Sequence, residues 1–127
     1  MTRPDDEAVV ASAFELIEIA EVERLLEAGG AAAFTAGELA YARARSDPAR
    51  RLAARLAAKR AASRLLGDPV GAADIEVVRG RYGPPRLALS PAAHERLLAL
   101  GGRDTLVSLT HERRHAAAVV LLLRDER

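Results

Sequence analysis

The pattern of hydrophobic and polar positions begins with an imperfect alternation over residues 13–19, AFELIEI. Aromatic and β-branched side chains in this run favour a first strand, with Glu15 and Glu18 as its polar members. The next apolar positions, over residues 22–26, follow the period of a short amphipathic helix. Residues 1–12 precede both patterns and are interpreted as a flexible lead-in.

Two further helices carry start signals. Thr35, followed three residues later by Glu38, forms a capping box and predicts a helix that begins at the next residue. Pro48 ends that helix and opens a longer one, for which Asp47 is the predicted cap. Leucines at helical spacing continue this long helix until Gly67, which ends it.

The rest of the chain predicts a hairpin, a helix and two final strands. In order, these elements cover residues 74–79, 86–89, 91–100, 105–110 and 116–123. The order β-α-α-α-β-β-α-β-β lacks the alternation of a parallel α/β protein. It predicts an α+β fold, with a mainly antiparallel sheet and a long central helix, as a single domain over residues 1–127.

Composition makes the predicted core thin. Of the 127 residues, 28 are alanines, which bury little area each, so oligomerisation is a reasonable expectation. No apolar run approaches the length of roughly 20 residues that a membrane span requires, and the amino terminus does not resemble a signal peptide. We therefore expect a cytoplasmic protein without a membrane partner.

Nucleophilic and metal-ligating side chains are sparse. The chain has no cysteine and three histidines, of which His111 and His115 are four residues apart. On one strand they would share a face, but two histidines without a third ligand are more typical of a structural pair.

The charges are segregated along the chain. Residues 5–27 contain eight acids and one arginine, whereas six cations and no anion lie between Arg50 and Arg64 on the long helix. Such a helix needs acidic neighbours, which this chain's acidic segment, another subunit, a phosphorylated ligand or an acidic protein would supply. Four aromatic residues and an isoelectric point near 8.3 argue against nucleic acid as the partner.

Several sequence blocks resemble one family. The blocks are FTAGELAY from Phe34, RLAARLAAKRAASRLLG from Arg51, DIEVV from Asp74, GPPRLAL from Gly83 and VSLTHE from Val107. They are similar, in order and spacing, to the motifs of bacterial holo-acyl-carrier-protein synthases, the short 4′-phosphopantetheinyl transferases. The resemblance implies a homotrimer with active sites between subunits. It also implies magnesium-dependent transfer of phosphopantetheine from coenzyme A to a serine of an acidic acyl carrier protein.

The resemblance also implies roles for individual residues. The positions that line the coenzyme A site in the family are matched by Arg55, Ser63, Arg64, Gly67 and His111. The implied catalytic set is Glu18, Lys59, Arg60 and His111. Arg24 falls where the family carries an arginine that docks the carrier protein.

Two departures from the family pattern concern the metal. Glu18 aligns with the aspartate that binds Mg²⁺, and Arg60 replaces the glutamate that is the other ligand. A guanidinium about 4 Å from a divalent cation is repelled by roughly 8 kcal/mol at an effective dielectric of 20. Arg60 would then clamp the pyrophosphate itself, or pair with Glu18 in a degenerate homologue that binds the carrier without transfer, or serve a different reaction on a carrier-tethered acyl chain.

Overall fold

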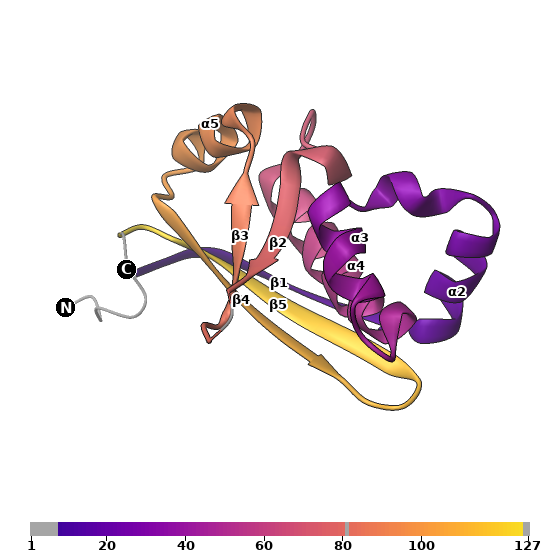
Figure 1. The fold of residues 1–127 in the computed structure, drawn as a ribbon. Helices are drawn as coiled ribbons and strands as arrows, with labels where there is room; N and C mark the ends of the chain where they lie inside the picture. Colours follow the sequence, from indigo (N-terminus) through magenta and orange to yellow (C-terminus); the bar gives the residue numbers. More distant parts are fainter. Residues whose placement is uncertain (1–7, 81, 126–127) are drawn as a thin grey trace.

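The structure is a computed structural model that describes residues 8–80 and 82–125 (Figure 1). Its strands and helices are β1 (Val9–Glu18), α2 (Ile19–Glu27), α3 (Ala36–Arg43), α4 (Pro48–Leu66), β2 (Ile75–Arg79), β3 (Pro85–Leu89), α5 (Pro91–Ala99), β4 (Asp104–His111) and β5 (His115–Leu123). The 3₁₀ helices η1 (Gly30–Ala33) and η2 (Ala72–Asp74) were not predicted. The fold class is α+β, as the sequence pattern predicts.

The start of β1 corrects the predicted lead-in. Residues 9–12 belong to this strand, where Val9 pairs with Leu123 and Ser12 with Leu121. The run VVAS over residues 9–12 does not alternate clearly between apolar and polar side chains, so the sequence pattern did not predict a strand there. These residues join the sheet because they pair with the apolar strand β5. Residues 1–7 of the lead-in lie outside the described residues.

Of the two helix caps that the sequence analysis predicts, one forms. The capping box before α3 is complete, because Glu38 N donates to Thr35 Oγ1 at 3.1 Å and Thr35 N donates to Glu38 Oε1 at 2.8 Å. Ser90 caps α5 by accepting from the backbone N–H of Ala93. The predicted cap of α4 is wrong: Asp47 makes no side-chain cap bond and instead accepts from Arg51 Nε at 3.1 Å.

The strands form two antiparallel sheets rather than one. One sheet has the order β1-β5-β4, and the hairpin β2-β3 forms the other. Alternate residues of β1 face α4, where Ile17 is buried and Glu15 is half-buried. Phe14 and Leu16 lie on the opposite face, with 57% and 58% of their surface exposed. Figure 1 shows the helices gathered on one side of the three-stranded sheet.

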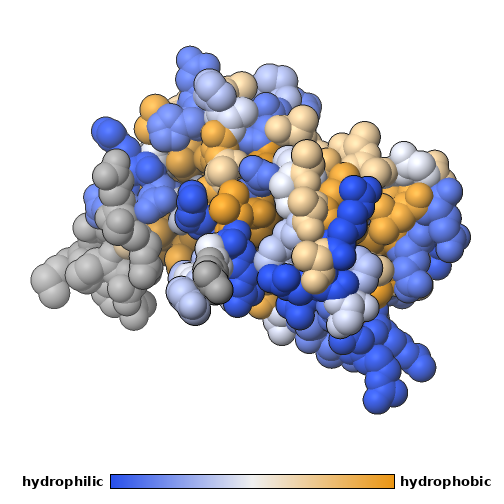
Figure 2. Space-filling view, viewed as in Figure 1, coloured by the Kyte–Doolittle hydropathy of each residue, from blue (hydrophilic) through white to orange (hydrophobic). Residues whose placement is uncertain are grey.

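Helix α4 is the centre of the core. Its alanines are buried almost completely, and these small side chains let the helix axis lie close to β1 and β5. Hydrophobic patches nevertheless remain at the surface between hydrophilic side chains (Figure 2). No helix in residues 8–80 and 82–125 is long and apolar enough to cross a membrane.

Candidate functional site

The cations of α4 have almost all found acidic partners within the chain. Five ion pairs join them to carboxylates: Arg50 and Arg51 to Asp47, Lys59 to Glu38, Arg60 to Glu21, and Arg64 to Glu15. Two of these carboxylates come from the acidic amino-terminal segment, as one of the sequence hypotheses proposes. Among the described residues, Arg55 is the one cation of this helix without a carboxylate partner.

Arg55 is a buried guanidinium with unused donors. Its exposed fraction is 3%, and it stacks over the Tyr41 ring with 4.0 Å between the guanidinium carbon and the ring centroid. Nη1 donates to the Arg51 carbonyl at 3.3 Å, whereas Nε and Nη2 have no hydrogen-bond partner among the described residues. Burial and nearby Arg79 lower the pKa of Arg55, although a guanidinium stays charged at neutral pH. A buried guanidinium with unused N–H donors is stabilised by an anion that accepts from them.

Arg55 lies in a cationic pocket of about 260 Å³, between α4, β2 and the end of β4. Its polar lining consists of Arg51, Arg55, Arg79, Thr110 and His111. Burial, together with Arg51 and Arg50, lowers the pKa of His111, while Asp47 opposes this effect. We infer that the pocket suits a phosphate, which would accept from the guanidinium donors.

The remaining residues predicted to bind coenzyme A do not join this pocket. Ser63 lines a second pocket of about 380 Å³, together with Lys59 and Arg60 of the implied catalytic set. Arg60 is five residues after Arg55, and therefore roughly 140° further round the helix. In the single chain, Arg55 and His111 therefore line one pocket and Ser63 the other, whereas Arg64 and Gly67 line neither of the two. We refer to these two pockets as half-sites.

Gly67 has a conformational reason for its identity. Its φ of 78° lies in the left-handed region, and its N–H donates to the Ser63 carbonyl at the end of α4. A ligand role for Gly67 stays a prediction.

Arg60 does not pair with Glu18, which was one of the three alternatives for this arginine. Arg60 Nη2 instead contacts Glu21 Oε2 at 2.8 Å, and Arg64 Nη1 contacts Glu15 Oε2 at 2.5 Å. The alternation of β1 explains this, because Glu15 faces α4 with Ile17 whereas Glu18 faces away.

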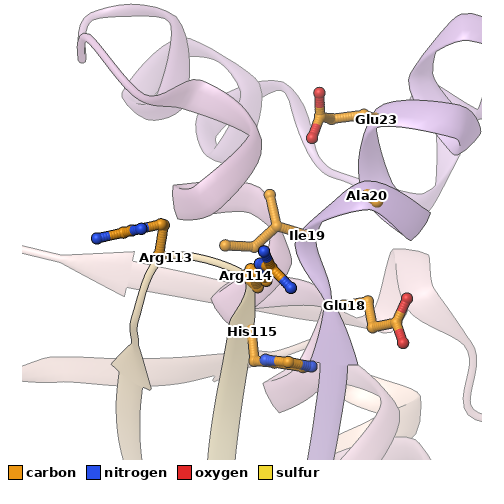
Figure 3. A pocket seen from close by; sticks show the side chains of 7 residues that line it. All are labelled: Glu18, Ile19, Ala20, Glu23, Arg113, Arg114 and His115. Carbon is orange, nitrogen blue, oxygen red and sulfur yellow. The ribbon is translucent and has the colours of Figure 1, made fainter.

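Glu18 lines a different pocket of about 380 Å³, at the junction of β1 and α2. Figure 3 shows its carboxylate directed away from Arg113, with His115 below. His115 Nδ1 lies 2.8 Å from Glu112 Oε1, and His111 and His115 end up on different strands. They are therefore not the same-strand pair considered from the sequence, and a metal role for Glu18 stays a prediction.

Lys59 is a buried structural cation in this chain. Its exposed fraction is 1%, and its Nζ donates to Glu38 Oε1 at 2.6 Å. Glu38 Oε2 also accepts from the Val77 N–H at 2.7 Å, so this ion pair ties α3, α4 and β2 together. The catalytic role implied for Lys59 stays a prediction.

Sequence reasoning missed several residues that shape these sites. They are Glu15, Glu21, Tyr41, Arg51 and Arg79. Tyr41 and Arg51 lie in the quoted sequence blocks, but nothing in their spacing indicates contact with Arg55. Arg79 comes from β2, and only the folded arrangement brings it to α4.

The fold and its half-sites define a small α+β protein in which a long basic helix presents cations to two pockets. No family model matches the chain. The holo-[acyl-carrier-protein] synthase of Deinococcus radiodurans is 44% identical over an aligned length of 128 positions. The alignment covers 90% of this chain and 92% of that protein. The holo-[acyl-carrier-protein] synthase of Thermus thermophilus is 42% identical over an aligned length of 119 positions. This alignment covers 90% of this chain and 93% of that protein.

Solved structures agree with these relatives. The acyl carrier protein synthase of Mycobacterium tuberculosis has a TM-score of 0.69 at 38% identity, covering 90% of this chain and 96% of that one. The Bacillus anthracis holo-(acyl-carrier-protein) synthase, solved in complex with coenzyme A (3′,5′-ADP), has a TM-score of 0.75 at 25% identity and covers 93% and 99%. The chain belongs to the holo-acyl-carrier-protein synthase family.

Proposed function

We propose that this protein transfers the 4′-phosphopantetheine arm of coenzyme A to a serine of an acyl carrier protein. The observation that carries the proposal is Arg55, a buried guanidinium whose Nε and Nη2 have no partner among the described residues. Coenzyme A supplies a 3′-phosphate and a pyrophosphate, which are the acceptors that the cationic pocket suits. Family membership supports the same ligand, because the Bacillus anthracis relative was solved with coenzyme A.

In this reaction the serine oxygen forms a bond to the phosphorus that carries the pantetheine arm. The bond between that same phosphorus and the oxygen that bridges the two phosphorus atoms breaks, 3′,5′-ADP leaves with the bridging oxygen and the electron pair, and the serine proton passes to solvent. Arg55 and His111 would hold one phosphate of coenzyme A, and hydrogen bonds that strengthen as charge develops would stabilise the transition state. Arg24 is an exposed residue of α2 that lies between Glu23 and Glu27 in the sequence, and its side chain would contact the carrier protein.

The two half-sites support a homotrimeric assembly. Arg55 and Arg60, which line the two pockets, are roughly 140° apart around α4, and neighbouring copies of the chain would supply opposite pockets to one coenzyme A. The outer face of the three-stranded sheet offers an apolar surface for such contacts, composed of Phe14, Leu16, Leu106 and Val119. These side chains are 38–58% exposed in the single chain, which favours a partner on this face.

Replacing Phe14 with Asp should break this assembly, because it places a charge in the middle of the apolar face. We expect light scattering to give the mass of a trimer for the wild type and of a monomer for the variant. Leu98→Asp is the matched control, since Leu98 on α5 is 43% exposed and lies away from this sheet face. A wild type that is monomeric at assay concentration would contradict the trimer.

Coenzyme A binding should draw a proton onto His111. Burial, Arg51 and Arg50 lower the pKa of His111 in the empty pocket, and an arriving phosphate raises it by opposing these effects. The affinity advantage of the wild type over His111→Gln should therefore shrink as the pH rises through the pKa that His111 has in the complex. Calorimetry in two buffers of different ionisation enthalpy measures the proton uptake, and equal uptake in both proteins would contradict this role.

The proposed function is tested by mass spectrometry of an apo acyl carrier protein incubated with coenzyme A and the full chain. A gain of one phosphopantetheine group, located on a serine, is the expected result. The alternative of a homologue that binds the carrier without transfer has no support from the relatives described above, which are named synthases. Carrier binding without any mass gain would favour that alternative.

A further inference from the structure

Two arginines on one face of α4 are anchored to the acidic segment of the chain. Arg60 and Arg64 are four residues apart, so they lie one helical turn from each other. Arg60 is held by Glu21 of α2, whereas Arg64 is held by Glu15 of β1 and also donates from Nη2 to the Phe14 carbonyl at 2.9 Å. Both side chains keep solvent access, with exposed fractions of 44% and 58%.

The residues at this place do not fit the divalent cation that the family resemblance implies. Mg²⁺ prefers carboxylate oxygens and near-octahedral geometry. Here Glu15 and Glu21, which face α4, each already hold a guanidinium, so an ion between them would meet two positive charges. Glu18 is on the outward face of β1, and residues 8–80 and 82–125 contain no group of three His, Asp or Glu side chains placed to hold a metal.

We propose that Arg60 and Arg64 take the place of the divalent cation at the pyrophosphate of coenzyme A. This inference rests on the proposed transferase function. Arg60 borders the same pocket as Ser63, and of its three nitrogens Nη2 makes the contact with Glu21. The guanidinium plane presents five N–H donors in all, so a group anchored on one side still has donors for phosphate oxygens on the other.

Glu15 and Glu21 act as positioning residues in this arrangement. Each orients a flexible arginine side chain before the ligand arrives, which lowers the entropy lost on binding. The remaining guanidinium N–H groups then donate to the pyrophosphate oxygens and stabilise the negative charge that collects on the departing 3′,5′-ADP. The transfer is therefore independent of added magnesium.

The test compares coenzyme A binding, measured by calorimetry, and transfer, measured by mass spectrometry, in EDTA and in excess Mg²⁺. Both should agree within about twofold between the two buffers. Arg60→Gln and Arg64→Gln should each weaken coenzyme A binding by about tenfold, the size expected for one charge-assisted hydrogen bond. Arg103 is an exposed arginine before β4, and Arg103→Gln is the matched control. This variant should bind coenzyme A as tightly as the wild type does.

Binding or transfer that requires Mg²⁺ would overturn this inference and leave the proposed function standing. Absence of coenzyme A binding in both buffers would overturn the proposed function itself. Circular dichroism melting of each variant checks that the fold is retained.

Metal binding gives a second readout that does not depend on activity. Mn²⁺, followed by electron paramagnetic resonance, substitutes for Mg²⁺ as the probe. The wild type should bind no stoichiometric Mn²⁺, whereas Arg60→Glu should gain binding, because it removes a cation and adds a carboxylate beside Glu21. Stoichiometric Mn²⁺ in the wild type, lost on replacement of Glu15 or Glu21 by Gln, would contradict the inference.

Discussion

Replacing Arg55 with Met is expected to weaken coenzyme A binding by 100-fold or more while leaving the fold intact or more stable. The affinity falls because Nε and Nη2 are the donors that the phosphate would use, and each charge-assisted hydrogen bond contributes about 1.5–3 kcal/mol. Two such bonds lost correspond to about 3–6 kcal/mol, which is at least a 100-fold change in the dissociation constant. Calorimetric titration with coenzyme A measures this effect.

The stability of Arg55→Met should move in the opposite direction from its affinity. In the unliganded protein Arg55 is a buried charge with unsatisfied donors, and methionine removes that desolvation penalty while keeping a long side chain against Tyr41. The thermal midpoint of the variant should therefore equal or exceed that of the wild type. A variant that unfolds more readily would show that Arg55 is a structural residue, and Arg103→Met controls for the loss of a surface charge.

Local signals in the sequence predicted most of the fold, because the residues that make them interact with near neighbours. The capping box joins Thr35 and Glu38, which are only three residues apart in the sequence, and it forms as predicted. Asp47 carries the same kind of signal but has two arginines within four residues, and its ion pairs replaced the cap. Competition between nearby partners, rather than propensity, decided that end of α4.

The candidate site was harder to predict because its contacts join distant parts of the chain. A shift of one position along β1 exchanges the inward and outward faces, so the choice between Glu15 and Glu18 depends on strand register. The family resemblance pointed to Glu18, but pairing of β1 with β5 turns Glu15 toward Arg64. The basic character of α4 was correctly expected to need acidic partners. Arg55 could be told apart from the other cations of this helix only in the folded structure, where each of the others pairs with a carboxylate.

Lys59→Met should destabilise the protein by about 3–5 kcal/mol, the size typical when one member of a buried ion pair is removed. The substitution leaves the Glu38 carboxylate in the core, where it keeps the backbone N–H groups of Thr35 and Val77 but loses its cation. For a domain of this size that is a large share of the total stability. Urea unfolding followed by circular dichroism measures the change.

The double variant Lys59→Met with Glu38→Gln separates the structural role of this lysine from a catalytic one. Removing both charges together should recover part of the lost stability, because no buried charge remains. The recovery is incomplete because the one amide oxygen of glutamine can accept from the N–H of Thr35 or of Val77, but not from both as the two carboxylate oxygens do. If this folded double variant still transfers phosphopantetheine at a rate close to that of the wild type, Lys59 serves to hold α3, α4 and β2 together. A well-folded double variant without activity would instead assign Lys59 a direct part in the reaction, which its 1% exposure in the single chain argues against.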